Sequence, residues 1–165
     1  MSAILRSATF KIYAATGLII FATQVYAAEP AYQPAERGAR QMNQGKKLET
    51  DAVLRQGMDN IRQAMAASQE GIGKESLGIQ DYQQLAATVD KNIADIVKNC
   101  KLTRDADTAF HGIVLGDLTQ STELMRTSQK AQAQRVGALG VLQSLRNYGE
   151  YFQHPGWNVS AAKSR

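Results

Sequence analysis

Apolar residues recur at helical spacing over most of the chain after residue 50, and this spacing limits what the chain can fold into. The clearest series has steps of three, four, four, three and four, and consists of Tyr82, Leu85, Val89, Ile93, Ile96 and Cys100. Residues with this spacing share one face of an α-helix and form a seam like that of a coiled coil. Asp90 and Lys91 fall on the outward side of the same segment. The pattern predicts a helix that packs against other helices.

Other segments show the same kind of spacing. An earlier one contains Leu54, Met58, Ile61 and Met65. A later one contains Phe110, His111, Val114, Leu115, Leu118, Leu124 and Met125. The last contains Val136, Leu139, Leu142, Leu145, Tyr148, Tyr151 and Phe152. No segment alternates apolar and polar residues with the period of two that predicts a β-strand.

Capping and helix-breaking residues set the expected limits of these helices. We expect the first helix to begin at about Thr50 and to end near Ser68, ahead of a glycine-containing stretch. Thr103 or Asp105 can cap the third helix, because a side-chain oxygen there accepts a hydrogen bond from a free backbone N–H. Pro155 stops the fourth. The sequence therefore predicts an all-α fold, an antiparallel up-down-up-down four-helix bundle with short loops.

The N-terminus predicts a cleavable signal peptide. Arg6 and Lys11 give it a positive start, an apolar run covers residues 12–21, and Val25-Tyr26-Ala27 offers the small residues that signal peptidase accepts. The apolar run is shorter than the roughly 20 residues that a spanning helix needs. We therefore expect cleavage and no stable membrane insertion afterwards.

The chain then divides into distinct parts. We expect a signal peptide over residues 1–27, a flexible polar lead-in over 28–49, the bundle over 50–157 and a loose tail over 158–165. Export places the protein in the periplasm or outside the cell. The net charge of +4 includes two positive charges of the signal peptide, and the remaining Lys and Arg residues are scattered. Because nucleic-acid binding needs a basic face, we expect no nucleic-acid partner.

The sequence lacks the familiar signatures of catalysis. It contains no glycine-rich phosphate loop, no G-x-S-x-G motif and no H-E-x-x-H pair. It also lacks the C-x-x-C-H motif that attaches haem covalently, and only two histidines are present. We therefore expect a protein that is not an enzyme.

The predicted topology gathers chemically distinctive residues at one end of the bundle. In an up-down-up-down bundle, the starts of the first and third helices meet the ends of the second and fourth. This places Met58, Cys100, His111 and His154 near the same end. Cys, His and Met are ligands that suit copper(I), and Cys with His suits zinc. The sequence thus predicts a copper or zinc site in a periplasmic carrier, sensor or stress-response accessory.

Each of these residues also has an ordinary structural interpretation. Cys100 and Met58 continue apolar series, so core packing explains both of them. His111 can be a hydrogen-bonded core or interface residue, and His154 can cap the last helix. The single cysteine of an exported chain can also form a bridge to another molecule.

The end of the last helix is the most aromatic part of the chain. It contains Tyr148, Tyr151, Phe152 and Trp157. Clustered aromatic residues often mark a contact surface, so the alternative function is a non-catalytic interaction module that binds a protein partner or a second copy. The other interpretation is a hydrophobic plug that closes the end of the bundle.

The chain resembles a group of small exported proteobacterial helical proteins of unassigned role. The shared features are Asn99-Cys100-Lys101-Leu102, His111 and the ending Tyr151-Phe152-Gln153-His154-Pro155-Gly156-Trp157. The architecture is also similar to that of the periplasmic four-helix cytochromes. In their non-covalent members, a Met early in the first helix and a His at the end of the fourth bind haem. Met58 and His154 have roughly those places, so this resemblance implies haem binding as a third possibility.

Overall fold

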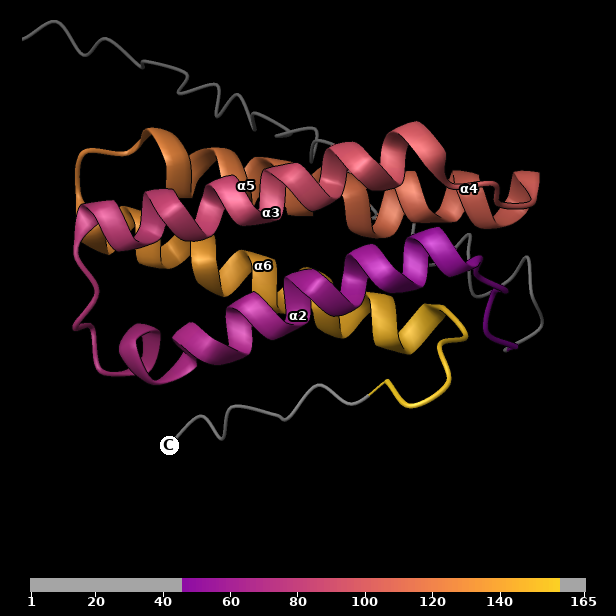
Figure 1. The fold of residues 1–165 in the computed structure, drawn as a ribbon, viewed down its shortest axis with the longest axis horizontal. Helices are drawn as coiled ribbons and strands as arrows, with labels where there is room; N and C mark the ends of the chain where they lie inside the picture. Colours follow the sequence, from indigo (N-terminus) through magenta and orange to yellow (C-terminus); the bar gives the residue numbers. More distant parts are fainter. Residues whose placement is uncertain (1–45, 158–165) are drawn as a thin grey trace, which may run out of the picture. The chain divides into compact units, whose positions relative to one another are not determined.

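The fold consists of long helices packed side by side (Figure 1). The computed structural model describes residues 46–157; the predicted signal peptide, most of the lead-in and the predicted tail lie outside this range. Its helices are α2 (Ala52–Gly73), α3 (Ile79–Asn99), α4 (Arg104–Phe110), the π-helical turn η1 (His111–Leu115), α5 (Gly116–Thr127) and α6 (Ala131–Tyr151). Because α4, η1 and α5 run on without interruption, the described residues form four helical rods, and the all-α prediction is confirmed for this part of the chain. None of the described helices is both long and apolar enough to cross a membrane.

Helix α2 starts where the sequence predicts and ends later than predicted. Asp51 caps it, because one carboxylate oxygen accepts a hydrogen bond of 2.7 Å from the N–H of Leu54. The helix passes the predicted end near Ser68 and continues to Gly73. Ile72 is only 1 % exposed, and its carbonyl accepts a hydrogen bond of 2.8 Å from Arg135 of α6. Tertiary contacts therefore outweigh the low helix propensity of glycine in this last turn.

The third rod changes its helical register in the middle. Thr103 caps it, as predicted, by accepting a hydrogen bond from the N–H of Ala106. The residues from His111 to Leu115 then form a π turn, which has more residues per turn than an α-helix. Phe110 is buried before this turn and His111 is exposed. The prediction that His111 shares the inward face of Phe110 was therefore wrong.

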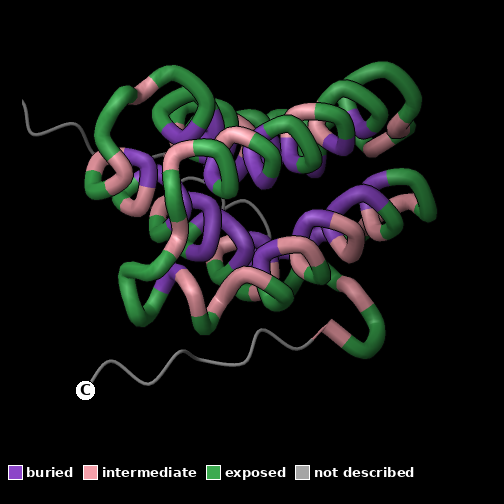
Figure 2. The backbone as a smooth tube through the Cα atoms, turned by 60° about the vertical axis from the view of Figure 1, so that its left-hand side comes forward, coloured by how far each residue is buried: buried purple, intermediate pink, exposed green. Residues whose placement is uncertain are grey.

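Neighbouring rods run antiparallel, as their residue pairs show. On α2 and α3, Gly57 lies against Ile96 and Asn60 donates a hydrogen bond to Asn92, so the numbers rise on one helix as they fall on the other. Figure 2 shows the buried faces of the rods turned toward one another. Asn92 is among the buried residues, at 7 % exposure, whereas the predicted seam residue Ile93 is only partly buried.

The inward face of α6 differs from the predicted one. Val136 and Leu139 are 60 % and 41 % exposed, whereas Gly137, Ala138 and Val141 are buried. The predicted series advanced by steps of three, and each such step falls short of a full turn of 3.6 residues. The series therefore drifts around the helix, and its first two members lie on the solvent side.

Gly137 allows α6 to approach α5 closely, and this contact predicts a loss of stability in Gly137→Ala. A Cβ atom there would lie 2.5 Å from the carbonyl oxygen of Ser121 and 3.0 Å from the backbone nitrogen of Met125. Because backbone atoms cannot move aside, we expect the free energy of unfolding to fall by about 1–3 kcal/mol. Urea denaturation followed by circular dichroism measures this change.

Gly73→Ala is the matched control, since a Cβ atom at position 73 meets nothing within 4 Å. We expect no loss of stability in this variant, because alanine has the higher helix propensity. Equal unfolding midpoints for Gly137→Ala and Gly73→Ala would contradict the close contact.

Candidate functional site

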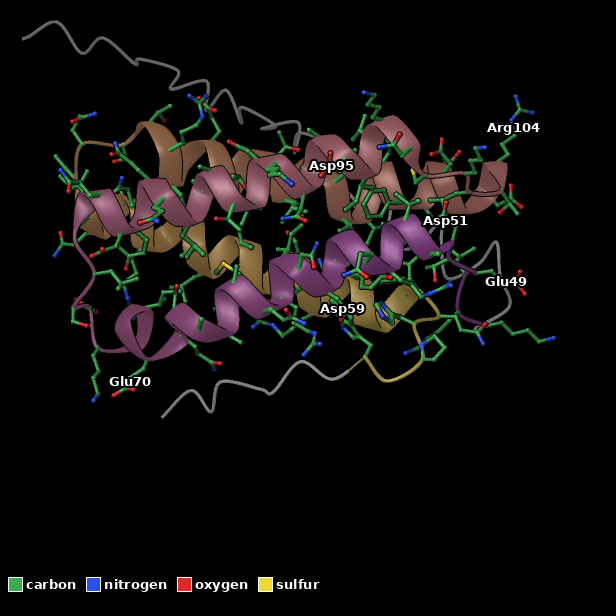
Figure 3. All side chains as sticks on the ribbon, in the orientation of Figure 1. Glu49, Asp51, Asp59, Glu70, Asp95 and Arg104 are labelled. Atoms are coloured by element: carbon green, nitrogen blue, oxygen red, sulfur yellow. The ribbon has the colours of Figure 1, made fainter. Side chains whose placement is uncertain are left out.

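The end of the bundle that holds the predicted site residues is held together by Asp51. One of its carboxylate oxygens caps α2, and the other accepts a hydrogen bond from the backbone N–H of Lys101, just after α3. Figure 3 shows Asp51 at the same end of the bundle as Glu49 and Arg104, with Glu70 at the opposite end. The start of α2 and the end of α3 are thus fixed to each other by a single side chain.

Residues before α2 pair with residues after α6 at this end. The N–H of Leu48 donates to the carbonyl of Tyr151 at 2.9 Å, and the N–H of Gln153 donates to the carbonyl of Leu48 at 2.7 Å. This makes a short parallel bridge between Leu48 and Phe152, and Leu48 is 7 % exposed. The hydroxyl of Thr50 also donates to the carbonyl of Gln153 at 2.6 Å. The last residues of the expected lead-in are therefore part of the bundle.

His154 uses both of its ring nitrogens within the protein. Its Nε2 lies 3.2 Å from a carboxylate oxygen of Asp59 on α2, and its Nδ1 lies 3.0 Å from the hydroxyl of Tyr148 on α6. The side chain is 5 % exposed. Because a carboxylate only accepts hydrogen bonds, a neutral ring carries its proton on Nε2 and accepts from Tyr148 at Nδ1. Burial lowers the pKa of His154, while the negative charge of Asp59 acts in the opposite direction.

The ring of Trp157 packs against both Tyr148 and His154. Its ring centroid lies 4.7 Å from that of Tyr148 and 4.9 Å from that of His154. The guanidinium of Arg62 lies 5.4 Å from its centroid, a cation–π contact, and Arg62 also pairs with Asp59 at 2.9 Å. We call this set of five residues, His154, Trp157, Tyr148, Asp59 and Arg62, the terminal clasp.

The aromatic residues predicted to contact a partner lie mostly inside the bundle. Tyr148 and Phe152 are fully buried with their rings stacked at 5.4 Å, and Tyr151 is 7 % exposed. Burial also raises the pKa of Tyr148, so its hydroxyl keeps its proton. Only Trp157 is partly exposed. In this conformation the group fills the end of the bundle, as a hydrophobic plug would, and a partner could reach Trp157 alone.

Asp107 lies near His111 and acts electrostatically on Cys100. Cys100 is partly buried at the end of α3, and burial raises the pKa of its thiol, an effect that the carboxylates of Asp51 and Asp107 strengthen. The Nε2 of His111 lies 3.7 Å from a carboxylate oxygen of Asp107, one turn earlier in the same rod. Both side chains of that pair are about half exposed, with 56 % for His111 and 52 % for Asp107.

The predicted metal ligands are not assembled as one group. Among residues 46–157, no three His, Cys, Asp or Glu side chains lie close enough together to hold a metal ion. Met58 is fully buried in the core, and His154 is already bonded through both nitrogens. The pair implied by the resemblance to haem proteins, Met58 and His154, is thus occupied by packing and hydrogen bonds. Metal and haem binding remain predictions.

A groove between α2 and α3 is a feature that the sequence interpretation missed. It is open to solvent and has a volume of about 380 Å³. Gly57 and Ile96 lie at its base, and Val53, 36 % exposed, lies at its edge. Asp95, labelled in Figure 3, lines it from α3. No sequence pattern marked the groove, because the space beside the glycine on the buried face of α2 is filled by the side chain of Ile96.

A chain of amides lines this groove. Gln56 donates to Asn60 at 3.0 Å, Asn60 donates to Asn92 at 2.9 Å, and Asn92 donates to the carbonyl of Thr88 at 2.8 Å. The buried Asn92 is thereby satisfied, as a buried polar side chain must be. These amides and Asp95 are the polar groups of the groove, and its other lining residues are apolar.

Comparisons with known proteins identify no relative, since no family model, no curated protein and no solved structure matches this chain. The structure shows an all-helical fold with four helical rods over residues 46–157.

The terminal clasp predicts that Gly149→Ala displaces Trp157. A Cβ atom at position 149 would lie 2.5 Å from Cδ1 of the indole, so the ring must move away. We expect the tryptophan emission to shift to longer wavelength as the ring becomes hydrated. The signal is specific because the chain has a single tryptophan. Gly73→Ala serves as the control, and an unchanged spectrum in Gly149→Ala would show that the ring is not docked there.

Proposed function

We propose that the chain is an exported, non-catalytic binding protein that holds a polypeptide partner in the groove between α2 and α3. The observation that carries the proposal is the concave, largely apolar shape of this groove. Its volume of about 380 Å³ is in the range of known ligand sites, which combine apolar walls with a few polar groups. An apolar side chain of the partner would contact Ala52 and Val53, the exposed apolar residues of the lining.

The polar residues of the groove favour a peptide over an entirely apolar ligand. The exposed amide of Gln56 can both donate to and accept from a peptide group. Asp95 also lines the groove; its side chain is 59 % exposed and pairs with Lys91 of the same helix at 3.4 Å. Complementary charge steers association, so the segment that fits best has an apolar residue next to a Lys or Arg. Support for export comes from the signal-peptide pattern of the sequence.

Two valine substitutions test the groove. Val53→Glu puts a carboxylate on its edge, whereas Val136→Glu makes the same change on the outer face of α6, away from the groove. Each protein is immobilised and exposed to an extract of the native compartment. We expect the wild type and Val136→Glu to retain the same partner, and Val53→Glu to retain at least tenfold less of it. Partner retention that is lost in Val136→Glu and kept in Val53→Glu would rule out the groove.

A second candidate function, transition-metal binding, is favoured by the position of Asp107. This carboxylate contacts His111 and acts on the thiol of Cys100, so two of the predicted ligands have an acidic neighbour in common. A thiolate, an imidazole and a carboxylate together form a set that suits zinc, and the first two suit copper(I). His111 and Asp107 are exposed on a helix surface, so their side chains have room to change rotamer when an ion binds. The protein would then act as a carrier, sensor or stress-response accessory.

Metal titration of the melting temperature tests this second candidate. We expect Zn(II) or Cu(I) at a hundredfold excess over its Kd to stabilise the wild type by about 2.7 kcal/mol. Cys100→Ala and Asp107→Ala should remove this gain, whereas His154→Gln should keep it, because His154 is not part of the proposed set. A gain that persists in Cys100→Ala, or no gain with either ion, would reject the site.

A further inference from the structure

We propose that the chain forms a symmetric dimer in which residues 47–49 of two copies pair as antiparallel β-strands. This segment is one side of the short parallel bridge between Leu48 and Phe152. The proposal is independent of the groove between α2 and α3 and of the metal candidate. It rests on the open backbone edge of this segment and on the two charges that flank Leu48.

The edge of residues 47–49 that faces away from Phe152 is unpaired. Leu48 uses both of its backbone groups within the bridge, since its N–H donates to Tyr151 and its carbonyl accepts from Gln153. The backbone groups of successive residues in an extended chain point to opposite sides, so those of Lys47 and Glu49 point away from the bridge. Within residues 46–157, no hydrogen bond reaches the N–H or C=O of Lys47 or Glu49. Such an edge is a template for pairing with another chain.

The space beside this edge is open to solvent. A cavity of about 620 Å³ is lined by residues 46–49 together with Thr103, Asp105 and Gln153. Four consecutive residues line it, whereas a cavity over one face of an extended segment would meet only alternate residues. Figure 3 shows Glu49 at the end of the bundle, outside the helices. A second chain can therefore reach the backbone groups of the edge.

Thr50 sets the limit of the open edge. Its hydroxyl donates to the carbonyl of Gln153 at 2.6 Å, and its carbonyl accepts a hydrogen bond from Arg55. Asp51 then caps α2. The edge available for pairing thus ends at Glu49.

The open edge is complementary to a second copy of itself. In antiparallel strands, every second pair of opposite residues exchanges both N–H···O bonds. When Lys47 lies opposite Glu49 of the second copy, these residues form such a pair, and the two-fold axis creates the same pair a second time. All the outward N–H and C=O groups of Lys47 and Glu49 are then satisfied in both copies.

The charges favour the same register. Lys47 and Glu49 are exposed and lie two residues apart, so their side chains share a face. Opposite charges that face each other across antiparallel strands attract. The ammonium of Lys47 donates to the carbonyl of Gly149 at 2.6 Å and keeps further donors for a carboxylate. A register shifted by two residues would place Lys47 opposite Lys47, or Glu49 opposite Glu49. Charges often protect a sheet edge from pairing, but these two charges are complementary to their own copies.

Sedimentation equilibrium of the chain expressed with its own signal sequence tests the dimer. Because the interface is small, we expect the mass of the wild type to rise from that of a monomer toward that of a dimer at concentrations up to about 1 mM. Lys47→Glu and Glu49→Lys each replace two attractive contacts by two repulsive ones, so each should raise the Kd about tenfold. Lys98→Glu makes the same charge change at an exposed lysine of α3 and should leave the Kd unchanged.

A mixture of the two single variants and an exchange measurement decide the outcome. In the mixture, Lys47→Glu and Glu49→Lys again bring opposite charges together, so association should return to the wild-type level. In the wild type, the amides of Lys47 and Glu49 should exchange their hydrogens more slowly above the Kd, as followed by NMR. Far-UV circular dichroism checks that each variant keeps its helices.

The dimer is overturned if the wild type stays monomeric up to about 1 mM, or if exchange at Lys47 and Glu49 is the same at low and high concentration. It is also overturned if both single variants associate as the wild type does, if their mixture does not associate, or if Lys98→Glu weakens association equally.

Discussion

Close approach of helices at positions without a side chain is the constraint on which the rest of the structure depends. Gly57 brings α2 against Ile96 of α3, and Gly137 brings α6 against the backbone of α5 at Ser121. Dispersion contacts at such short range are individually small and collectively large, so each glycine fixes the register of a helix pair. Gly57 also belongs to the lining of the groove, so the packing of α2 against α3 and the proposed binding surface meet at this position.

The helix ends depend on side chains that reach between rods. The last carbonyls of a helix have no partner within it. Gln134, fully buried on α6, donates to the carbonyl of Met125 at 2.8 Å, and Arg135 donates to the carbonyl of Ile72 at 2.8 Å. At the opposite end of the bundle, Asp51 joins the start of α2 to the segment after α3. Each end is therefore closed by hydrogen bonds between rods.

The sequence was informative where structure is local and uninformative where it is not. Helical spacing predicted every rod, and the cap at Thr103 was identifiable because capping needs only neighbouring residues. The π turn that begins at His111 was not predictable from a period of 3.6, and His111 is exposed although Phe110 beside it is buried. The electrostatic effect of Asp107 on Cys100 depends on how the rods pack, whereas His111 lies near Asp107 because the two residues are one turn apart in the same rod. The bonding of His154 to Asp59 depends on a contact between the end of the chain and α2, for which the sequence has no local pattern.

The bridge between Leu48 and Phe152 has a mechanical consequence. The two bridged segments are parallel, one leading into α2 and the other leading out of α6. A force that pulls on the described region from both sides therefore acts on the two segments in opposite directions. It loads both backbone hydrogen bonds of Leu48 in shear at the same time, instead of breaking them one after the other.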